Sequence, residues 1–113
     1  MTVNVIIDRP LGSAHPKYKD HIYPVNYGYV PGILAGDGEE QDVYVLGVEV
    51  PVTEFTGQII AIVHRRDDVE DKWVAAPEGM YFSEEEIRTA VAFQEQYFDS
   101  EITVFPPQPK VAP

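Results

Sequence analysis

The sequence predicts a small, mainly β domain in which several short strands form a barrel that one late helix closes or flanks. Short stretches rich in β-branched residues alternate with turn residues through most of the chain. One amphipathic helix pattern follows them. The 113 residues suffice for one domain and leave no room for two. We therefore expect a single domain over residues 1–113, with a proline-rich tail at residues 105–113.

The predicted strands are short and are separated by proline and glycine. The first covers residues 2–8, and turn residues end it at residues 10–13. A short second strand is expected over residues 17–22. An irregular or kinked strand follows at residues 23–32, where two prolines and two glycines interrupt the pattern. Further strands are predicted at residues 42–48, 57–64 and 73–76.

The predicted helix covers about residues 84–98. Ser83 is a good N-cap, and Glu86 three residues later completes a capping box. Ile87 and Val91 fall on one face, which predicts that the helix packs against the barrel on that side.

Composition excludes several classes of protein. Nineteen Asp and Glu residues face eight Lys and Arg residues, a net charge of -11, which disfavours binding to nucleic acid. The longest aliphatic run, residues 59–63, is too short to span a membrane, and the first residues lack the pattern of a secretory signal. The absence of cysteine excludes disulfides and thiolate zinc sites, so a cytoplasmic location is expected. An anionic substrate would require recruited positive charge, for which divalent metal ions are the obvious source.

Two acidic segments are candidate metal sites. A glycine turn leads into a strand at residues 37–42, and it can fold Asp37, Glu39 and Asp42 towards one another. Carboxylate oxygens favour Mg²⁺, Mn²⁺ or Ca²⁺. The second segment, residues 65–72, is a charged connection between two strands. A solvated acidic turn and an exposed hairpin tip, respectively, are the alternatives.

A third segment, residues 23–32, carries three tyrosines between prolines and glycines. Core packing with the hydroxyl groups at the rim is one interpretation. A rigid wall of hydroxyl donors beside an anion site is the other.

These segments together resemble the soluble inorganic pyrophosphatases of family I. That family has a Tyr-Pro-x-Asn-Tyr-Gly segment shortly before an Asp-x-Asp-x-x-Asp metal motif, and here Tyr23-Pro-Val-Asn-Tyr-Gly28 precedes Asp37-Gly-Glu-Glu-Gln-Asp42. The resemblance implies an OB-like five-stranded barrel with one C-terminal flanking helix. It also implies Mg²⁺-dependent hydrolysis of inorganic pyrophosphate to two phosphates. Bacterial members form homo-oligomers, so self-association is a further expectation.

Carried over residue by residue, the resemblance implies a set of site residues. The implied metal ligands are Asp37, Asp42, Asp67 and Asp71, with Glu70 as the alternative to Asp71. The implied catalytic residues are Glu39 and Tyr27. The implied substrate-binding residues are Lys17, Lys72 and Tyr97, and Arg65 is a plausible replacement for a cation that the family has elsewhere.

The chain departs from the family pattern at several of these positions. Glu39 stands where the metal motif has its middle aspartate, and Phe98 stands where a lysine is expected. The shortened segment before Tyr23 also lacks the family's phosphate-binding arginine. The main alternative to an enzyme is therefore a non-catalytic pyrophosphatase-like protein that binds metal or phosphate compounds. An oligonucleotide-binding module of the same fold is a third alternative, which the net charge disfavours.

Overall fold

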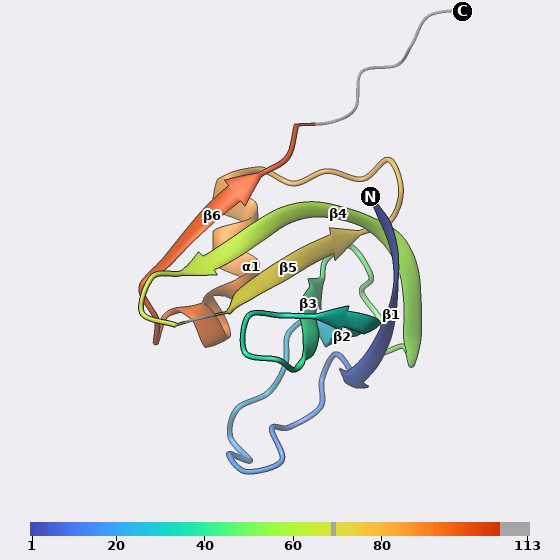
Figure 1. The fold of residues 1–113 in the computed structure, drawn as a ribbon. Helices are drawn as coiled ribbons and strands as arrows, with labels where there is room; N and C mark the ends of the chain where they lie inside the picture. Colours follow the sequence, from blue (N-terminus) through green and yellow to red (C-terminus); the bar gives the residue numbers. More distant parts are fainter. Residues whose placement is uncertain (69, 107–113) are drawn as a thin grey trace, which may run out of the picture.

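The computed structural model describes residues 1–68 and 70–106 of the chain. In order, its elements are β1 (Thr2–Arg9), β2 (Asn26–Leu34), β3 (Glu40–Val45), β4 (Glu54–Arg65), β5 (Asp71–Ala76), α1 (Glu84–Glu95) and β6 (Ser100–Val104) (Figure 1). Within these two ranges, no helix is long and apolar enough to cross a membrane. Most of the proline-rich tail expected at residues 105–113 lies outside the described residues, and the single-domain boundary stays a prediction.

Five strands close into a barrel, which confirms the predicted fold class. They pair in the order β1, β2, β3, β5 and β4, and β4 pairs with β1 again. The β3–β5 pair is parallel, and the other four pairs of the barrel are antiparallel. The long strand β4 also pairs with β6. Because β3 and β5 run parallel, the turn before β3 and the connection before β5 lie at the same edge of the barrel.

Closure of the barrel depends on a close approach between β1 and β2. Gly28 of β2 pairs with Ile7 of β1. A Cβ atom at Gly28 would lie 1.8 Å from the carbonyl oxygen of Ile6, which is far inside van der Waals contact. Glycine is therefore required at this position because no side chain fits between the two backbones.

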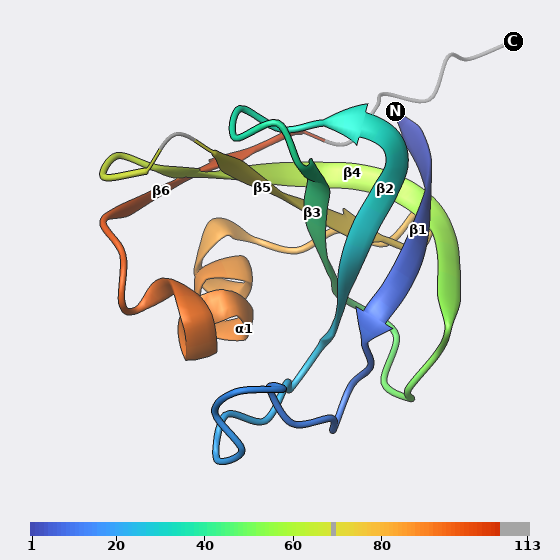
Figure 2. The ribbon, with the colours of Figure 1, turned by 60° about the horizontal axis from the view of Figure 1, so that its bottom comes forward.

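Helix α1 packs against the barrel as its apolar pattern predicts (Figure 2). The capping box is present, since the backbone N–H of Glu86 donates to Ser83 Oγ and the backbone N–H of Ser83 donates to Glu86 Oε1. Ile87 and Val91 are buried in the same core cluster as Tyr44. The helix ends at Glu95, three residues before the predicted end.

Two sequence-based assignments differ from the structure. The strand predicted over residues 17–22 is wrong, because the segment makes only an isolated bridge between Ala14 and Ile22. His15 Nδ1 accepts hydrogen bonds from the backbone N–H groups of Lys17 and Tyr18 at 3.0 and 3.2 Å, which fixes a turn there. The second difference is β6, which the sequence analysis did not predict.

Candidate functional site

Lys72 lies at the centre of the candidate site, between carboxylates from two strands. The parallel pairing of β3 and β5 brings Asp42 beside Lys72. Lys72 Nζ donates to Asp42 Oδ2 at 2.5 Å and to Glu70 Oε1 at 2.9 Å. The Lys72 side chain is only 5% exposed. Its positive ammonium group therefore reduces the repulsion between the Asp42 and Glu70 carboxylates.

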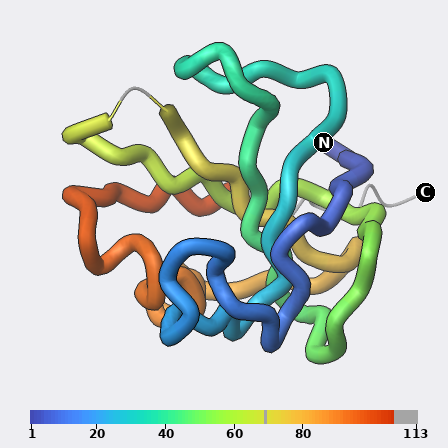
Figure 3. The backbone as a smooth tube through the Cα atoms, turned by 90° about the horizontal axis from the view of Figure 1, so that it is seen from below, coloured from blue at the N-terminus to red at the C-terminus, as the bar shows by residue number. Residues whose placement is uncertain are grey.

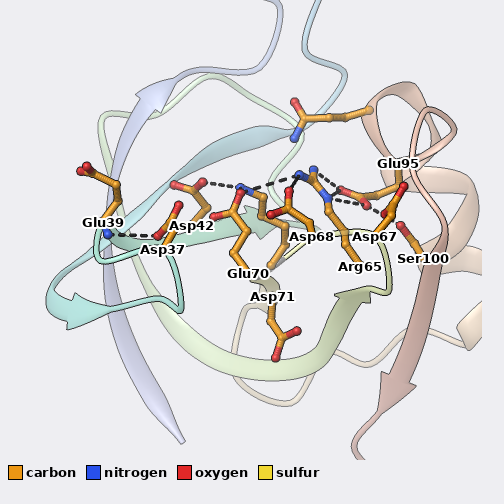
Figure 4. Close-up of polar contacts among 12 residues, drawn as sticks. Asp37, Glu39, Asp42, Arg65, Asp67, Asp68, Glu70, Asp71, Glu95 and Ser100 are labelled. Atoms are coloured by element: carbon orange, nitrogen blue, oxygen red, sulfur yellow. Dashed lines mark hydrogen bonds and ion pairs between the residues drawn. The ribbon is translucent and has the colours of Figure 1, made fainter.

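The turn before β3 adds a further carboxylate. Gly38 has φ +84°, a conformation that favours glycine, and the backbone N–H of Glu39 donates to Asp37 Oδ1 at 3.0 Å. That hydrogen bond is the main reason why the pKa of Asp37 is lowered. Figure 4 shows Asp37 directed towards Asp42 and Glu70, whereas the Glu39 side chain points away from them.

The pKa of Glu70 reflects this crowding. Burial raises it most, the nearby Lys72 ammonium opposes that effect, and the Asp37 carboxylate raises it further. Two carboxylates in such proximity are stable only with a proton or a cation between or beside them.

A second buried ion pair continues this row of charges. Arg65, at the end of β4, donates through Nη2 to Glu95 Oε2 at 2.7 Å and through Nε to Glu95 Oε1 at 3.0 Å. Tyr44 Oη and Ser100 Oγ also donate to the Glu95 carboxylate, at 2.5 and 2.6 Å. Burial by itself would raise the pKa of Glu95, but the hydrogen bonds from Arg65, Ser100 and Tyr44 outweigh it and lower the pKa.

The two ion pairs form one network. Arg65 Nη1 lies 3.7 Å from Glu70 Oε1, the atom that accepts from Lys72, and 3.6 Å from Asp68 Oδ2. The network therefore contains two cations, Lys72 and Arg65, and five carboxylates, Asp37, Asp42, Asp68, Glu70 and Glu95 (Figure 4). The excess of negative charge favours an additional cation.

Two predicted metal ligands have hydrogen-bond partners other than Lys72 and Arg65. The Asp71 carboxylate is 2.6 Å from His64 Nδ1 and points away from Glu70 (Figure 4). The Asp67 carboxylate accepts from the backbone N–H of Asp99 at 3.4 Å. Among residues 1–68 and 70–106, no three His, Asp or Glu side chains are gathered in the arrangement of a metal site. In the structure, the Lys72 ammonium group lies between the carboxylates of Asp42 and Glu70.

Tyr27 lies beside this network. Its pKa is raised well above the ordinary tyrosine value, chiefly by burial and next by the Asp42 charge. The Tyr27 hydroxyl group is therefore neutral at physiological pH and is able to donate a hydrogen bond. Lys72 Nζ lies 6.0 Å from the centre of the Tyr27 ring.

A cavity of about 800 Å³ opens beside the two cations. It lies between the end of α1 and the loop at residues 10–25, which run side by side in Figure 3, where the His21 and Phe93 ring centres are 5.5 Å apart. Its lining residues are His15, Tyr18, Lys19, Asp20, His21, Arg65, Lys72, Gln94, Tyr97 and Phe98. Three predicted substrate-binding residues, Arg65, Lys72 and Tyr97, thus share one cavity. Lys17 does not line it, and its Nζ instead lies 5.4 Å from the centre of the Tyr18 ring.

Glu95 is the residue of this site that the sequence analysis missed. It is 6% exposed, and its carboxylate forms an ion pair with Arg65. A signal was present, because Glu95 follows Ile87 and Val91 at intervals of four residues on the apolar face of α1. A carboxylate on a buried helix face requires a partner.

Comparisons with known proteins agree with this architecture. The family model described as inorganic pyrophosphatase matches residues 7–100. Among curated relatives, the inorganic pyrophosphatase of Xylella fastidiosa is 32% identical over 72% of this chain, and that of Saccharolobus solfataricus is 33% identical over 66%. The matched regions span only 57% and 55% of those two relatives.

Solved structures resemble the fold. The inorganic pyrophosphatase of Ehrlichia chaffeensis has a TM-score of 0.69 at 20% identity, covering 91% of this chain and 85% of that one. The enzyme from Neisseria gonorrhoeae has a TM-score of 0.67 at 22% identity, covering 85% and 73%. At these identities the likeness shows the fold of the barrel.

Proposed function

Because the chain belongs to the inorganic pyrophosphatase family, we propose that it hydrolyses inorganic pyrophosphate to two phosphates with Mg²⁺ as its cofactor. The observation that carries this proposal is the carboxylate-rich network at one edge of the barrel, which adjoins a cavity lined by Arg65 and Lys72. Carboxylates and cations side by side suit a substrate that is a metal-bound polyanion.

The chemistry of the donor set fits a divalent metal ion. Asp37, Asp42 and Glu70 supply the hard oxygen atoms that Mg²⁺ prefers, and the Lys72 charge does not neutralise all three. When bound, Mg²⁺ would supply positive charge to phosphate oxygens and make water a stronger nucleophile. We place Glu70 rather than Asp71 in the ligand set, because Asp71 is engaged by His64.

The chain's own side chains have distinct proposed tasks. Lys72 and Arg65 would bind phosphate oxygens, since both are basic side chains that line the cavity. Neutral Tyr27 would donate a hydrogen bond near Asp42. Glu95 would hold the Arg65 guanidinium in position through their hydrogen bonds. The assignments of Glu39 as a catalytic residue and of Asp67 as a metal ligand stay predictions. The Glu39 side chain points away from Asp42 and Glu70, and the Asp67 carboxylate accepts from the backbone N–H of Asp99.

The test is a phosphate-release assay on purified protein with pyrophosphate, with Mg²⁺ and with chelator. We expect Mg²⁺-dependent release, and we expect Asp42→Asn to lower the rate by about a hundredfold or more, because it removes a charged oxygen donor from the proposed metal ligands. Glu78→Gln, an equivalent change at an exposed position on the turn after β5, should leave the rate unchanged. No phosphate release by the Mg²⁺-loaded wild-type protein would refute the proposal.

One observation favours the second candidate, a non-catalytic protein that binds metal or phosphate compounds. Arg65 and Lys72, two of the three Lys and Arg side chains that line the cavity, are already paired with carboxylates, at 2.5 Å for Lys72 and Asp42 and at 2.7 Å for Arg65 and Glu95. Calorimetry with Mg²⁺ and methylenediphosphonate separates the candidates. Binding of this analogue without turnover of pyrophosphate would support the second one.

A further inference from the structure

The cavity beside Arg65 and Lys72 is lined by many more rings than a binding site for bare pyrophosphate requires. Its aromatic side chains are His15, Tyr18, His21, Tyr97 and Phe98. These rings come from the loop at residues 10–25 and from the segment just after α1, so they face one cavity from two sides. Sites that bind small polyanions need charge and hydrogen-bond donors, whereas aromatic walls are typical of sites for ligands with a planar apolar part.

Three of these rings are unusually accessible. Tyr97 is 71% exposed, Tyr18 is 59% exposed and Phe98 is 36% exposed. One face of Phe98 is covered by the Arg65 guanidinium, whose Cζ lies 3.7 Å from the ring centre. Tyr18 already contacts His15, with ring centres 5.2 Å apart. Tyr97 makes no ring or cation contact with another described residue, so its faces are available to a ligand.

The size of the cavity also indicates a ligand larger than pyrophosphate. About 800 Å³ lies within the range of sites that hold drug-sized ligands, and pyrophosphate is far smaller. Pyrophosphate bound at Arg65 and Lys72 would therefore fill only part of this cavity.

We propose that this cavity takes a nucleoside polyphosphate as its Mg²⁺ complex, with the phosphates at Arg65 and Lys72 and the base stacked on Tyr97. The inference rests on the proposed function, since it uses the same phosphate-binding residues and names a larger class of phosphoanhydride. The bound Mg²⁺ offsets the excess of carboxylates beside Lys72. Stacking of a base on an aromatic side chain strengthens binding by about tenfold.

Calorimetry with two matched probes tests the inference. Both α,β-methylene-ADP and methylenediphosphonate contain the same non-hydrolysable P–C–P unit, and only the first carries a nucleoside. In Mg²⁺, we expect the nucleotide to bind the wild-type protein about tenfold more tightly. Tyr97→Ala should remove most of that advantage, and Tyr97→Phe, which keeps the ring, should preserve it. Tyr81→Ala, at an exposed tyrosine outside the cavity, should change neither affinity.

The other outcomes separate this inference from the proposed function. Equal affinity for the two probes overturns the inference and leaves pyrophosphate hydrolysis standing. It is likewise overturned if Tyr97→Phe weakens both probes as much as Tyr97→Ala does, because Tyr97 would then act through its hydroxyl on phosphate. If neither probe binds, the inference fails, and the phosphate-release assay decides the proposed function separately. Tight nucleotide binding that depends on the Tyr97 ring, in a protein that releases no phosphate from pyrophosphate, supports the inference and refutes the proposed function.

Discussion

The side chains at and just before the start of β5 direct two adjacent carboxylates to different sides of the sheet. Successive side chains of a strand point to opposite faces, and Lys72 points inwards, where it is buried. Asp71 therefore points outwards to His64, and Glu70, two residues before Lys72, shares the inner side. The same alternation applied to the sequence alone would have favoured Glu70 over Asp71.

This placement predicts different effects for the two amide substitutions. Glu70→Gln should weaken Mg²⁺ binding by at least about tenfold, because it removes a charged oxygen donor beside Asp37 and Asp42. Asp71→Asn should leave the affinity nearly unchanged. Calorimetric titration of both variants with Mg²⁺ checks this. A larger loss for Asp71→Asn than for Glu70→Gln would contradict the placement.

Glu95 predicts a pH-dependent contribution to stability. Its pKa is lowered from the ordinary 4.5 in the folded protein, where Arg65 and two hydroxyl groups donate to it. As the pH falls below 4.5, the unfolded chain takes up this proton first. The stabilisation is therefore complete above that pH and is lost as the pH falls through the folded-state pKa.

The corresponding variant is Glu95→Gln. At neutral pH it should lower the free energy of unfolding by about 3 kcal/mol, because Arg65 is left buried without its carboxylate. The difference from the wild-type protein should shrink on acidification below pH 4.5. Urea denaturation across this range measures it, with Glu78→Gln as the exposed control. A difference that stays constant with pH would show that the Glu95 charge is not responsible.

Among the strands, the close pairing of β1 with β2 leaves no room for a side chain at position 28. Gly28→Ala would place a Cβ atom 1.8 Å from a backbone oxygen, so the strands would have to separate and the core would open. We expect a large loss of stability or insoluble protein. Gly38→Ala, at a turn glycine with φ +84° and nothing within 4 Å, should cost only about 1–2 kcal/mol. Thermal melts of both variants test this ranking, and equal melting temperatures would contradict it.

Local signals predicted some elements well, and long-range pairing explains what they missed. The capping box at Ser83 and Glu86 depends on residues three apart, so it is visible in the sequence and is confirmed. β6 has only five residues and is stabilised by its pairing with β4, about 40 positions earlier in the chain. The Arg65–Glu95 pair joins residues 30 positions apart, so no local sequence pattern predicts it.

At the scale of the whole molecule, the fold concentrates opposite charges at one place on a strongly acidic chain. The net charge is -11, yet Lys72 and Arg65, the two cations that are buried among residues 1–68 and 70–106, lie in one network at the edge where β3 and β5 begin. The parallel pairing of these two strands creates this edge, because it brings together segments about 30 residues apart. The sequence motifs predicted that such segments meet, whereas only the fold shows that Lys72 lies between their carboxylates.

The anomalous difference map of a crystal soaked in Mn²⁺, which substitutes for Mg²⁺ and scatters anomalously, tests the metal site most directly. We expect a peak within coordinating distance of Asp37, Asp42 and Glu70, with Lys72 moved away from at least one of its carboxylates. A map with no peak at these three residues, and with Lys72 still bound to Asp42 and Glu70, would contradict it.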